Sequence, residues 1–269
     1  RYRARPVASL LRSVVARRWC ARFRAAPLVY CNSITSVLLL GLLGAGPRTV
    51  VSHVHELEQA ISVQMPAADR SVLFNGVDWY VAASDLVKEN LVENHGVDPD
   101  RVARHYEFIE VDRFLDAVPD EVADLRERLA IPADAAVIGA VGVAEPRKGP
   151  DLFLDLAMDF RRREVGRPVH FVWVGADPAG EGTRWLTHDV DKAGLGDIVH
   201  VLGSQAVPAP WFQLFDAFVL TSREDPFPLV CLESSLLGTP IVCFDNTGMA
   251  EFAGEGECGY VVPYLDVHL

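Results

Sequence analysis

The residues with the clearest chemical potential lie between Thr221 and Phe244. In this stretch an apolar run ends at Ser222, a turn interrupted by prolines follows, and a helix is expected to begin near Leu229. The first turn of a helix presents backbone N–H groups that have no partner within the helix, and such groups bind phosphate readily. Asp225 lies on this turn, so a carboxylate is placed beside the expected anion site.

Glu233 is the second notable carboxylate, because it lies about one turn into that helix among apolar neighbours. A carboxylate at a buried edge is best satisfied by hydroxyl groups when no cation is close. The alternative is that Glu233 only complements the helix dipole, an effect of about 0.3–1 kcal/mol. The stretch therefore predicts a site for phosphate beside a site for a hydroxylated ligand.

Other signatures of catalysis or nucleotide binding are missing, namely GxGxxG, GxxxxGK[ST], GxSxG and HExxH. Two Asp-x-Asp pairs could suggest metal-assisted sugar transfer, at Asp98/Asp100 and at Asp189/Asp191. The first is predicted to lie in a loop. The second lies in a helical pattern, where residues i and i+2 do not share a face. We therefore expect no metal site and no cofactor.

These residues need a scaffold, and short apolar runs rich in β-branched residues recur along the chain. Such runs suit strands that are buried on both faces of a parallel sheet. They cover residues 27–31, 49–54, 77–83, 101–109, 135–141, 170–175, 198–203, 217–221 and 240–244. Helical patterns separate several of them, at residues 85–95, 150–163 and 229–237. This alternation predicts an α/β protein with two Rossmann-like, doubly wound parallel-sheet domains.

The pattern breaks between Glu110 and Asp134, where a turn at residues 111–118 and a charged helix at 120–129 are expected. We therefore place a first domain at residues 1–113 and a second at residues 114–269. Ligands of open α/β sheets bind outside the carboxyl ends of the strands, which would line the cleft between two such domains. One continuous wide sheet is the alternative.

Charge is distributed unevenly along the 269 residues. The formal net charge is −12, yet residues 1–25 hold eight arginines and no acid, so the other 244 residues sum to −12 − 8 = −20. An acidic body argues against nucleic-acid binding. The basic residues within 1–24 alternate with apolar ones, and this segment could lie on anionic lipid. The alternative is a helix whose apolar stripe packs on a sheet.

The remaining composition points to a protein of the cytoplasm, either free or peripheral at the inner membrane surface. Five cysteines without a CxxC spacing argue against a disulfide framework and a zinc cage. The longest apolar run, residues 37–45, is about half of what is needed to span a bilayer. Because the chain does not begin with Met, we expect it to be a fragment.

Asp225-x7-Glu233 resembles the Glu-x7-Glu signature of the retaining family 4 (group 1) glycosyltransferases, which have the GT-B fold. The surroundings are similar in order and spacing over residues 135–265. They comprise Asp216–Leu220, Leu237–Val242, the turn Ala144–Gly149 and Gly259–Pro263. The first half is similar more loosely, through residues 50–56. The resemblance implies transfer of a sugar from a nucleotide-diphosphate sugar to a glycan, lipid or small-molecule acceptor, without a metal.

The resemblance also implies roles for single residues. Asp225 would contact hydroxyls of the donor sugar, and Glu233 would accept both ribose hydroxyls. Lys148 would pair with the diphosphate and offset the charge of the leaving group. The N–H groups of Phe227 and Leu229, which flank Pro228, would hold diphosphate oxygens or the sugar.

Two further roles concern other loops. Gly203 would help to read the nucleobase through its main chain. His55 would face the reacting sugar from the first domain, although a strand-end histidine beside Glu56 could simply be hydrogen-bonded, and His53 is a rival on the same face. The family's reaction has the acceptor attack on the face that the nucleotide leaves, with a donor phosphate oxygen taking the proton.

The sequence departs from the family pattern in several places. The first glutamate is shortened to Asp225, and Pro226 and Pro228 replace glycines, which removes two N–H donors. The usual arginine before the lysine is missing, and Arg147 either substitutes for it or points to solvent. The familiar Asn-Gly-Val-Asp is also absent, with residues 107–112 in its place.

These departures keep other functions open. A nucleotide-sugar-binding protein without turnover is the alternative from a different class, and a sugar-nucleotide epimerase of the same fold is another enzyme. A Rossmann dehydrogenase is disfavoured because the glycine fingerprint is missing. Since members of the family are usually longer at the amino end, we expect the first domain to be incomplete and the fragment to have little or no transferase activity.

Overall fold

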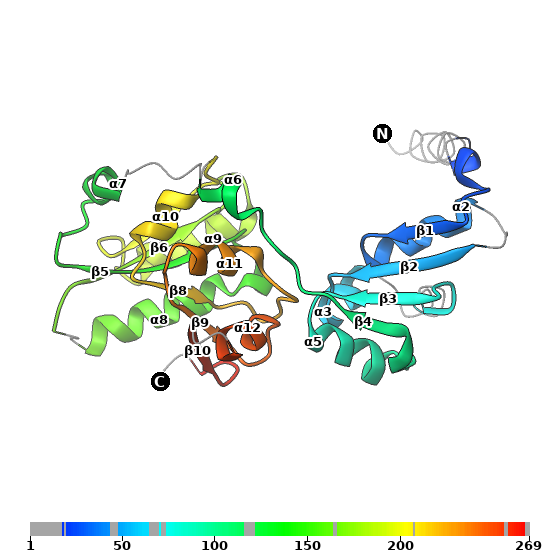
Figure 1. The fold of residues 1–269 in the computed structure, drawn as a ribbon. Coiled ribbons are helices and arrows are strands. Elements are labelled where there is room, and N and C mark those ends of the chain that lie inside the picture. The colour runs from blue at the N-terminus through cyan, green and yellow to red at the C-terminus, as the bar shows by residue number, and fades with distance from the viewer. Residues whose placement is uncertain are drawn as a thin grey trace. The chain divides into compact units, whose positions relative to one another are not determined.

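A computed structural model of the chain describes residues 18, 20–43, 48–64, 70, 74–115, 122–163, 166–206, 208–255 and 258–266. The chain divides into two compact units, Arg1–Tyr106 and Glu107–Leu269, and Figure 1 shows their helices and strands. The predicted domain boundary after residue 113 falls inside the helix α6 (Val111–Leu115). The division in the structure therefore precedes this helix.

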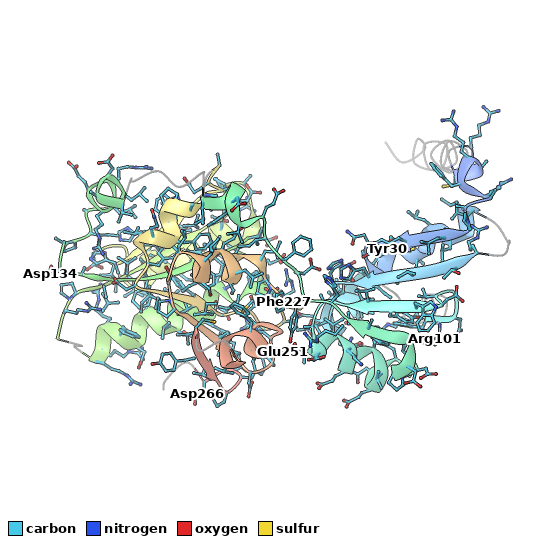
Figure 2. All side chains as sticks on the ribbon, viewed as in Figure 1. Tyr30, Arg101, Asp134, Phe227, Glu251 and Asp266 are labelled. Carbon is cyan, nitrogen blue, oxygen red and sulfur yellow. The ribbon has the colours of Figure 1, made fainter. Side chains whose placement is uncertain are left out.

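The first unit contains a parallel sheet whose strands are paired in chain order, β1-β2-β3-β4. Its strands are β1 (Leu28–Cys31), β2 (Thr49–Val54), β3 (Trp79–Ala82) and β4 (Val102–Arg104). The register pairs Tyr30 with Val51 and Val51 with Trp79, so these three side chains lie on one face. On this face Tyr30 and Trp79 are 54% and 52% exposed. Figure 2 labels Tyr30.

The helices of the first unit lie on the opposite face, because right-handed crossovers between consecutive neighbouring strands all pass on the same side. Their core includes the fully buried Ile34, Val54, Ile61, Val87 and Leu91. The helical segments are η1 (Ala21–Phe23), η2 (Ile34–Leu39), α2 (Leu40–Leu43), α3 (Glu58–Gln64), α5 (Asp85–Glu89), its π-helical continuation η3 (Asn90–Asn94), and η4 (Pro99–Arg101).

The second unit contains a parallel sheet of order β10-β9-β8-β5-β6-β7. Its strands are β5 (Ala136–Val141), β6 (Val169–Val174), β7 (Val199–Leu202), β8 (Ala217–Leu220), β9 (Ile241–Phe244) and β10 (Gly259–Val262). The chain builds outward from β5 to β7 and then returns to β8 on the other side of β5. The sheet is therefore doubly wound, with its switch point between β5 and β8.

Helices cover both faces of this second sheet. The helices α8 (Pro150–Arg163) and α9 (Glu181–Lys192) share one hydrophobic cluster with Phe171 and Trp173 of β6. The crossovers after β7 run in the other direction, so the right-handed rule places their helices on the second face. These are α10 (Ala209–Leu214), α11 (Leu229–Leu236) and α12 (Met249–Glu255), while α7 (Val122–Arg128) precedes β5 and η5 (Pro146–Lys148) follows it.

The predicted fold class of parallel α/β sheets is confirmed, and a strand lies within or across each of the nine expected runs. Three details differ. β10 was not predicted as a strand, the run at 101–109 is ordered as a strand only over β4, and the expected turn at 111–118 begins with the helix α6. The Asp98/Asp100 pair lies at the short helix η4, where the Asp98 side chain accepts a hydrogen bond from the N–H of Asp100.

Most of the basic amino-terminal segment, residues 1–17 and 19, lies outside the described residues. Its predicted contact with a membrane surface therefore stays a prediction. Within the described part of the chain, no helix combines the length and the apolar character needed to cross a bilayer.

Candidate functional site

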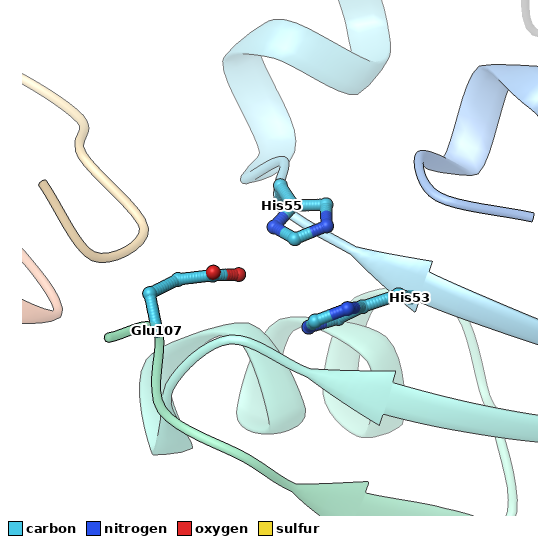
Figure 3. Close-up of side chains that lie close together, drawn as sticks. All are labelled: His53, His55 and Glu107. Carbon is cyan, nitrogen blue, oxygen red and sulfur yellow. The ribbon is translucent and has the colours of Figure 1, made fainter. Parts of the chain in front are cut away.

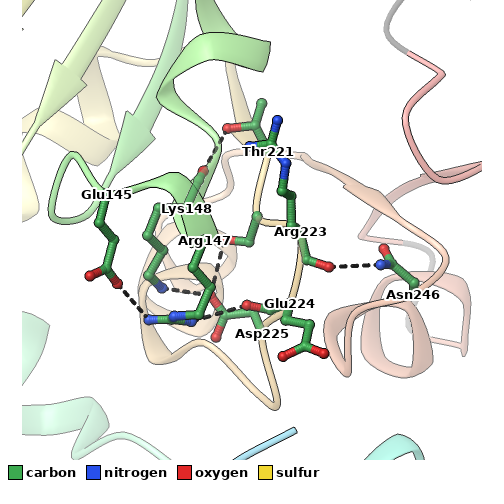
Figure 4. A network of polar contacts seen from close by, with 9 residues as sticks. Glu145, Arg147, Lys148, Thr221, Arg223, Glu224, Asp225 and Asn246 are labelled. Carbon is green, nitrogen blue, oxygen red and sulfur yellow. Dashed lines mark hydrogen bonds and ion pairs between the residues drawn. The ribbon is translucent and has the colours of Figure 1, made fainter. Parts of the chain in front are cut away.

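Two loops meet at the carboxyl ends of β5 and β8 in the second unit. The hydroxyl of Thr221 donates to the carbonyl oxygen of Lys148 at 3.0 Å, and the N–H of Arg223 donates to the carbonyl of Arg147 at 2.8 Å (Figure 4). Gly149 makes this approach possible, because its φ is +68° and a Cβ atom there would overlap the carbonyl oxygen of Thr221. The loops are therefore held together by one bond between main chains and one from the Thr221 hydroxyl to the main chain.

A buried ion pair joins the same two loops. Lys148 Nζ lies 2.5 Å from Asp225 Oδ2, and the hydroxyl of Ser222 donates to the same oxygen at 3.1 Å. Asp225 is only 5% exposed. Among the described residues its second oxygen, Oδ1, has no hydrogen-bond donor. The pair thus places an ammonium group and an available carboxylate oxygen at the edge where ligands of such sheets bind.

Arg147 adds a second cation to this cluster. Its guanidinium donates to the carbonyl oxygen of Glu224 at 3.0 Å and to the Glu145 carboxylate at 3.0 Å, and it lies 3.8 Å from Asp225 (Figure 4). Of the two orientations considered from the sequence, the structure has the side chain turned into the network. The geometry alone assigns it no contact with a ligand.

The turn after β8 leads directly into α11. Phe227 is buried at 7% exposure, and Pro228 is the N-cap residue, whose side chain makes no capping hydrogen bond. Within the described residues, the N–H groups of Leu229 and Val230 at the start of α11 have no backbone partner. This helix start therefore retains donors for an anion, despite the prolines at 226 and 228.

Glu233 is the fifth of the eight residues of α11 and is partly buried. Desolvation by burial raises the pKa of its carboxyl group. Among the described residues it has no hydrogen-bond or ion-pair partner. A partly buried carboxylate without a partner is poorly satisfied, and hydroxyl donors from a ligand would stabilise it.

Gly203 follows β7, where its carbonyl oxygen accepts from the N–H of Gly175 at 3.3 Å and from Gln205 Nε2 at 3.0 Å. These two donors fix the course of the loop after β7. Its carbonyl group is thus already engaged within the chain.

His55 belongs to the first unit, just after β2. Its Nε2 lies 3.1 Å from Asn32 Oδ1, and its backbone N–H donates to Glu56 Oε2 at 3.0 Å. The ring of His53 lies beside it, with ring centroids 4.0 Å apart (Figure 3). The structure therefore brings the donor-side residues Lys148, Arg147 and Asp225 together within one unit, whereas His55 lies in the other.

Sequence reasoning gave no role to three residues that shape the site. Arg223 makes a bidentate ion pair with Asp151 at 2.6 and 2.9 Å and also donates to the carbonyl of Pro146. This arginine lowers the pKa of the Asp151 carboxyl group. Asn246, after β9, donates to the carbonyl of Arg223 at 2.8 Å. Arg223 lies just after β8, Asn246 just after β9 and Asp151 at the start of α8. These positions are the signal that could have identified them.

Comparisons with known proteins agree with this architecture. The family described as "Glycosyl transferases group 1" matches residues 121–268. D-inositol 3-phosphate glycosyltransferase 2 of Catenulispora acidiphila is 31% identical over 194 residues, which cover 70% of this chain and 45% of the relative. D-inositol 3-phosphate glycosyltransferase of Frankia alni is 27% identical over 258 residues, covering 94% and 58%. The chain spans about half the length of these curated relatives.

Solved structures share the fold at lower identity. HepE of Anabaena in complex with UDP-glucose superposes with a TM-score of 0.78 at 19% identity, covering 94% of this chain and 69% of that one. Sucrose-phosphate synthase of Thermosynechococcus elongatus gives 0.74 at 22% identity, covering 94% and 65%. The two parallel α/β sheets are those of the GT-B fold. Since the family match includes the whole sheet that carries Lys148 and Asp225, the chain belongs to the group 1 glycosyl transferases.

Proposed function

We propose that the chain acts in the retaining, metal-independent transfer of a sugar from a nucleotide-diphosphate sugar to a glycan, lipid or small-molecule acceptor. The observation that carries this proposal is the buried Lys148–Asp225 pair at the carboxyl ends of β5 and β8. The complexes of HepE with UDP and UDP-glucose support a UDP-sugar as the first donor to test. The relatives named D-inositol 3-phosphate glycosyltransferase support an inositol phosphate as the first acceptor.

Lys148 is suited to hold the diphosphate. An ammonium group has three N–H donors, and Asp225 takes one of them. The other donors can reach phosphate oxygens, and the positive charge offsets the negative charge that develops on the departing nucleoside diphosphate. Arg147 adds a second positive charge on the same turn. The N–H groups of Phe227 and Leu229, on either side of Pro228, would complete the anion site.

Two carboxylates are assigned to hydroxyl groups of the donor. Asp225 would accept from a sugar hydroxyl through Oδ1, while Oδ2 stays with Lys148 and Ser222. Glu233 would accept from both ribose hydroxyls. Because such hydrogen bonds favour the ionised carboxylate, donor binding should lower the raised pKa of Glu233.

The remaining roles come from other loops. Gly203 would contact the nucleobase through its main chain, and His55 would face the reacting sugar from the first unit. The acceptor would attack on the face that the nucleotide leaves, and a donor phosphate oxygen would take its proton. The protein then contributes positioning and charge stabilisation. The basic residues within 1–24 would bring the chain to an anionic membrane surface if the acceptor is linked to lipid.

Isothermal titration with UDP and with uridine tests the donor site. Lys148→Ala should weaken UDP binding by about 10- to 100-fold, corresponding to about 1.5–3 kcal/mol for hydrogen bonds to a charged group. Uridine, which lacks phosphate, should lose less than about threefold, and the difference should shrink as salt is raised. Lys192→Ala, on the exposed side of α9, is the matched control. Equal losses for UDP and uridine would remove Lys148 from the phosphate site.

Release of UDP in the presence of UDP-sugars and acceptors tests turnover. Proton NMR of the product shows whether the anomeric configuration is retained. Binding of UDP-sugars without any release of UDP, in the full-length protein as well as in this chain, would favour the alternative of a nucleotide-sugar-binding protein. The prolines at 226 and 228 are the observation that keeps this alternative in view.

A further inference from the structure

His53 and His55 place two imidazole rings side by side on one strand of the first unit. Residues i and i+2 of an extended strand point to the same side, and His53 lies on β2 while His55 follows its last residue. The ring centroids are 4.0 Å apart and the ring planes are inclined by 42° (Figure 3). The two rings are therefore in contact and are tilted relative to each other.

Each ring is oriented by a hydrogen bond with a residue on or just after β1. The Tyr30 hydroxyl lies 2.7 Å from Nδ1 of His53, and Asn32 Oδ1 lies 3.1 Å from Nε2 of His55. A hydrogen bond to one ring nitrogen sets the tautomer and the direction of the other nitrogen, as it does for histidines that bind metals. Both imidazoles are thus oriented by the fold before any ion is bound.

The spacing of the rings suits a shared ion. A ring nitrogen of His53 and one of His55 lie within 4.8 Å of each other. Two nitrogens bound to one tetrahedral ion at 2.0–2.1 Å are separated by about 3.3 Å. Small side-chain rotations close this difference. His55 is partly exposed, whereas Nε2 of His53 is buried, so an ion would reach the pair from the side of His55.

We propose that His53 and His55 chelate a divalent transition-metal ion on this face of the first sheet. Imidazole nitrogen favours Cu²⁺, Ni²⁺ and Zn²⁺ over Mg²⁺ or Ca²⁺, and among these ions Cu²⁺ binds most tightly at a given site. Water fills the remaining coordination positions. The site rests on the two imidazoles of the first unit, and a bound ion would occupy the His55 ring that the proposed function places at the reacting sugar.

Titration of the tag-free, EDTA-treated chain with Cu²⁺ tests the proposal, followed by isothermal titration and by electron paramagnetic resonance. The chain should bind one equivalent with hyperfine coupling from two nitrogens. His53→Asn and His55→Asn should each weaken binding at least tenfold and remove one nitrogen coupling. His188→Asn, an exposed histidine on α9, is the matched control and should bind as the unchanged chain does.

A variant that keeps both imidazoles provides a second measurement. Tyr30→Phe removes only the hydroxyl that orients His53 and should weaken Cu²⁺ binding by about tenfold, as loss of an outer-shell partner does. Circular dichroism checks that each variant is folded. The proposal is overturned if both strand variants bind Cu²⁺ as tightly as the unchanged chain, or if His188→Asn loses as much as they do.

Discussion

Each unit has a buried carboxylate that ties together two loops at the carboxyl ends of its strands, and the two carboxylates are satisfied in different ways. In the first unit Glu56 accepts hydrogen bonds from the backbone N–H groups of Ile34 and His55 and from the hydroxyl of Ser33. All three donors are neutral and lie shortly after the carboxyl ends of β1 and β2, with Ile34 at the start of η2. The carboxylate of Glu56 therefore serves to fix the backbone conformation after these two strands.

In the second unit the carboxylate of Asp225 is instead paired with a positively charged side chain. Lys148 is its nearest partner at 2.5 Å, and only one oxygen of Asp225 is engaged among the described residues. An ion pair of this kind keeps unused donors on the ammonium group and an unused acceptor on the carboxylate. The comparison indicates that a carboxylate surrounded by backbone N–H groups maintains a loop, whereas a carboxylate paired with a lysine also offers polar groups to a ligand.

The largest expected effect is the loss of stability when a glycine in the left-handed conformation is replaced by alanine. One such glycine from each unit can be compared, because the two share this conformation but differ in their surroundings. Gly149 in the second unit has a φ of +68°, and Gly96 in the first has +66°, with open space where a Cβ atom would lie. Gly96→Ala should cost about 1–2 kcal/mol, the strain of the left-handed conformation. Gly149→Ala should cost about 3–5 kcal/mol, because backbone overlap with Thr221 adds to that strain.

Urea unfolding followed by circular dichroism measures both losses. Gly149→Ala should also weaken UDP binding, since it separates the loops that carry Lys148 and Asp225. Equal losses of stability for the two variants would show that the loops after β5 and β8 can move apart without cost.

The two carboxylates themselves can be compared by removal. Asp225→Ala leaves Lys148 buried without its partner and should lower the free energy of unfolding by about 3 kcal/mol. Glu56→Ala leaves buried N–H groups without an acceptor and should cost about 2–3 kcal/mol. UDP should restore part of the stability of Asp225→Ala, because phosphate supplies an anion for Lys148, and none of that of Glu56→Ala. Thermal unfolding with and without UDP measures how much stability each variant regains. Equal stabilisation of both variants by UDP would contradict the proposed difference between Asp225 and Glu56.

Glu233→Ala should weaken UDP binding by about 1.5–3 kcal/mol, the range for hydrogen bonds to a charged group. The loss should disappear for 2′,3′-dideoxy-UDP, which lacks the hydroxyls assigned to Glu233. Isothermal titration of both ligands against both proteins gives the four affinities required. Glu251→Ala, on α12, is a control on another helix of the same unit. If the dideoxy ligand loses as much as UDP, the ribose assignment is wrong.

The smallest expected effect is the change in the free energy of unfolding with pH. Burial, and then the neighbouring His170, lower the pKa of His200 to about 4. An unfolded histidine titrates near 6.5, so between pH 6.5 and 4 the unfolded chain binds a proton that the folded chain does not. The free energy of unfolding should therefore fall as the pH is lowered through this range, by about 1–2 kcal/mol after allowance for solvent screening of the partly exposed ring.

His200→Gln should remove this loss, while His188→Gln should leave it unchanged. In the first unit burial also lowers the pKa of His95, but Glu58 opposes the shift from 2.9 Å. That unit should consequently lose less stability over the same pH range. Urea unfolding at pH 7 and at pH 4.5 measures each difference.

The sequence predicted the strands well where both faces of a sheet are buried. β5 and β6 have almost no exposed residue, so continuous apolar runs mark them. β10 was missed because it is an edge strand whose Tyr260 is 73% exposed, which leaves no such run. The helix α6 has only five residues, too few to show a helical period.

The sequence predicted which residues form the site, but it did not predict which of them contact one another. Asp225 and Lys148 were each assigned a contact with the donor, but their pairing joins residues 77 positions apart and depends on the adjacency of β5 and β8. The same holds for Arg223 and Asp151, which are 72 positions apart. Local patterns indicate what a residue can do, whereas its partner is set by the order of strands in the sheet.

That strand order also has a consequence for the time course of folding. In the first unit every strand pairs with its successor in the chain, so each pairing closes a short segment. In the second unit the N–H of Val137 in β5 donates to the carboxylate of Asp216, 79 residues away. The ion pair between Lys148 and Asp225 joins residues 77 positions apart. Closing a long loop is slow because its entropy is lost before its contacts form. We therefore expect the ability to bind UDP to return after most of the circular-dichroism signal when the chain refolds from urea. Stopped-flow refolding with a fluorescent UDP analogue would show this delay, and simultaneous recovery of the two signals would contradict it.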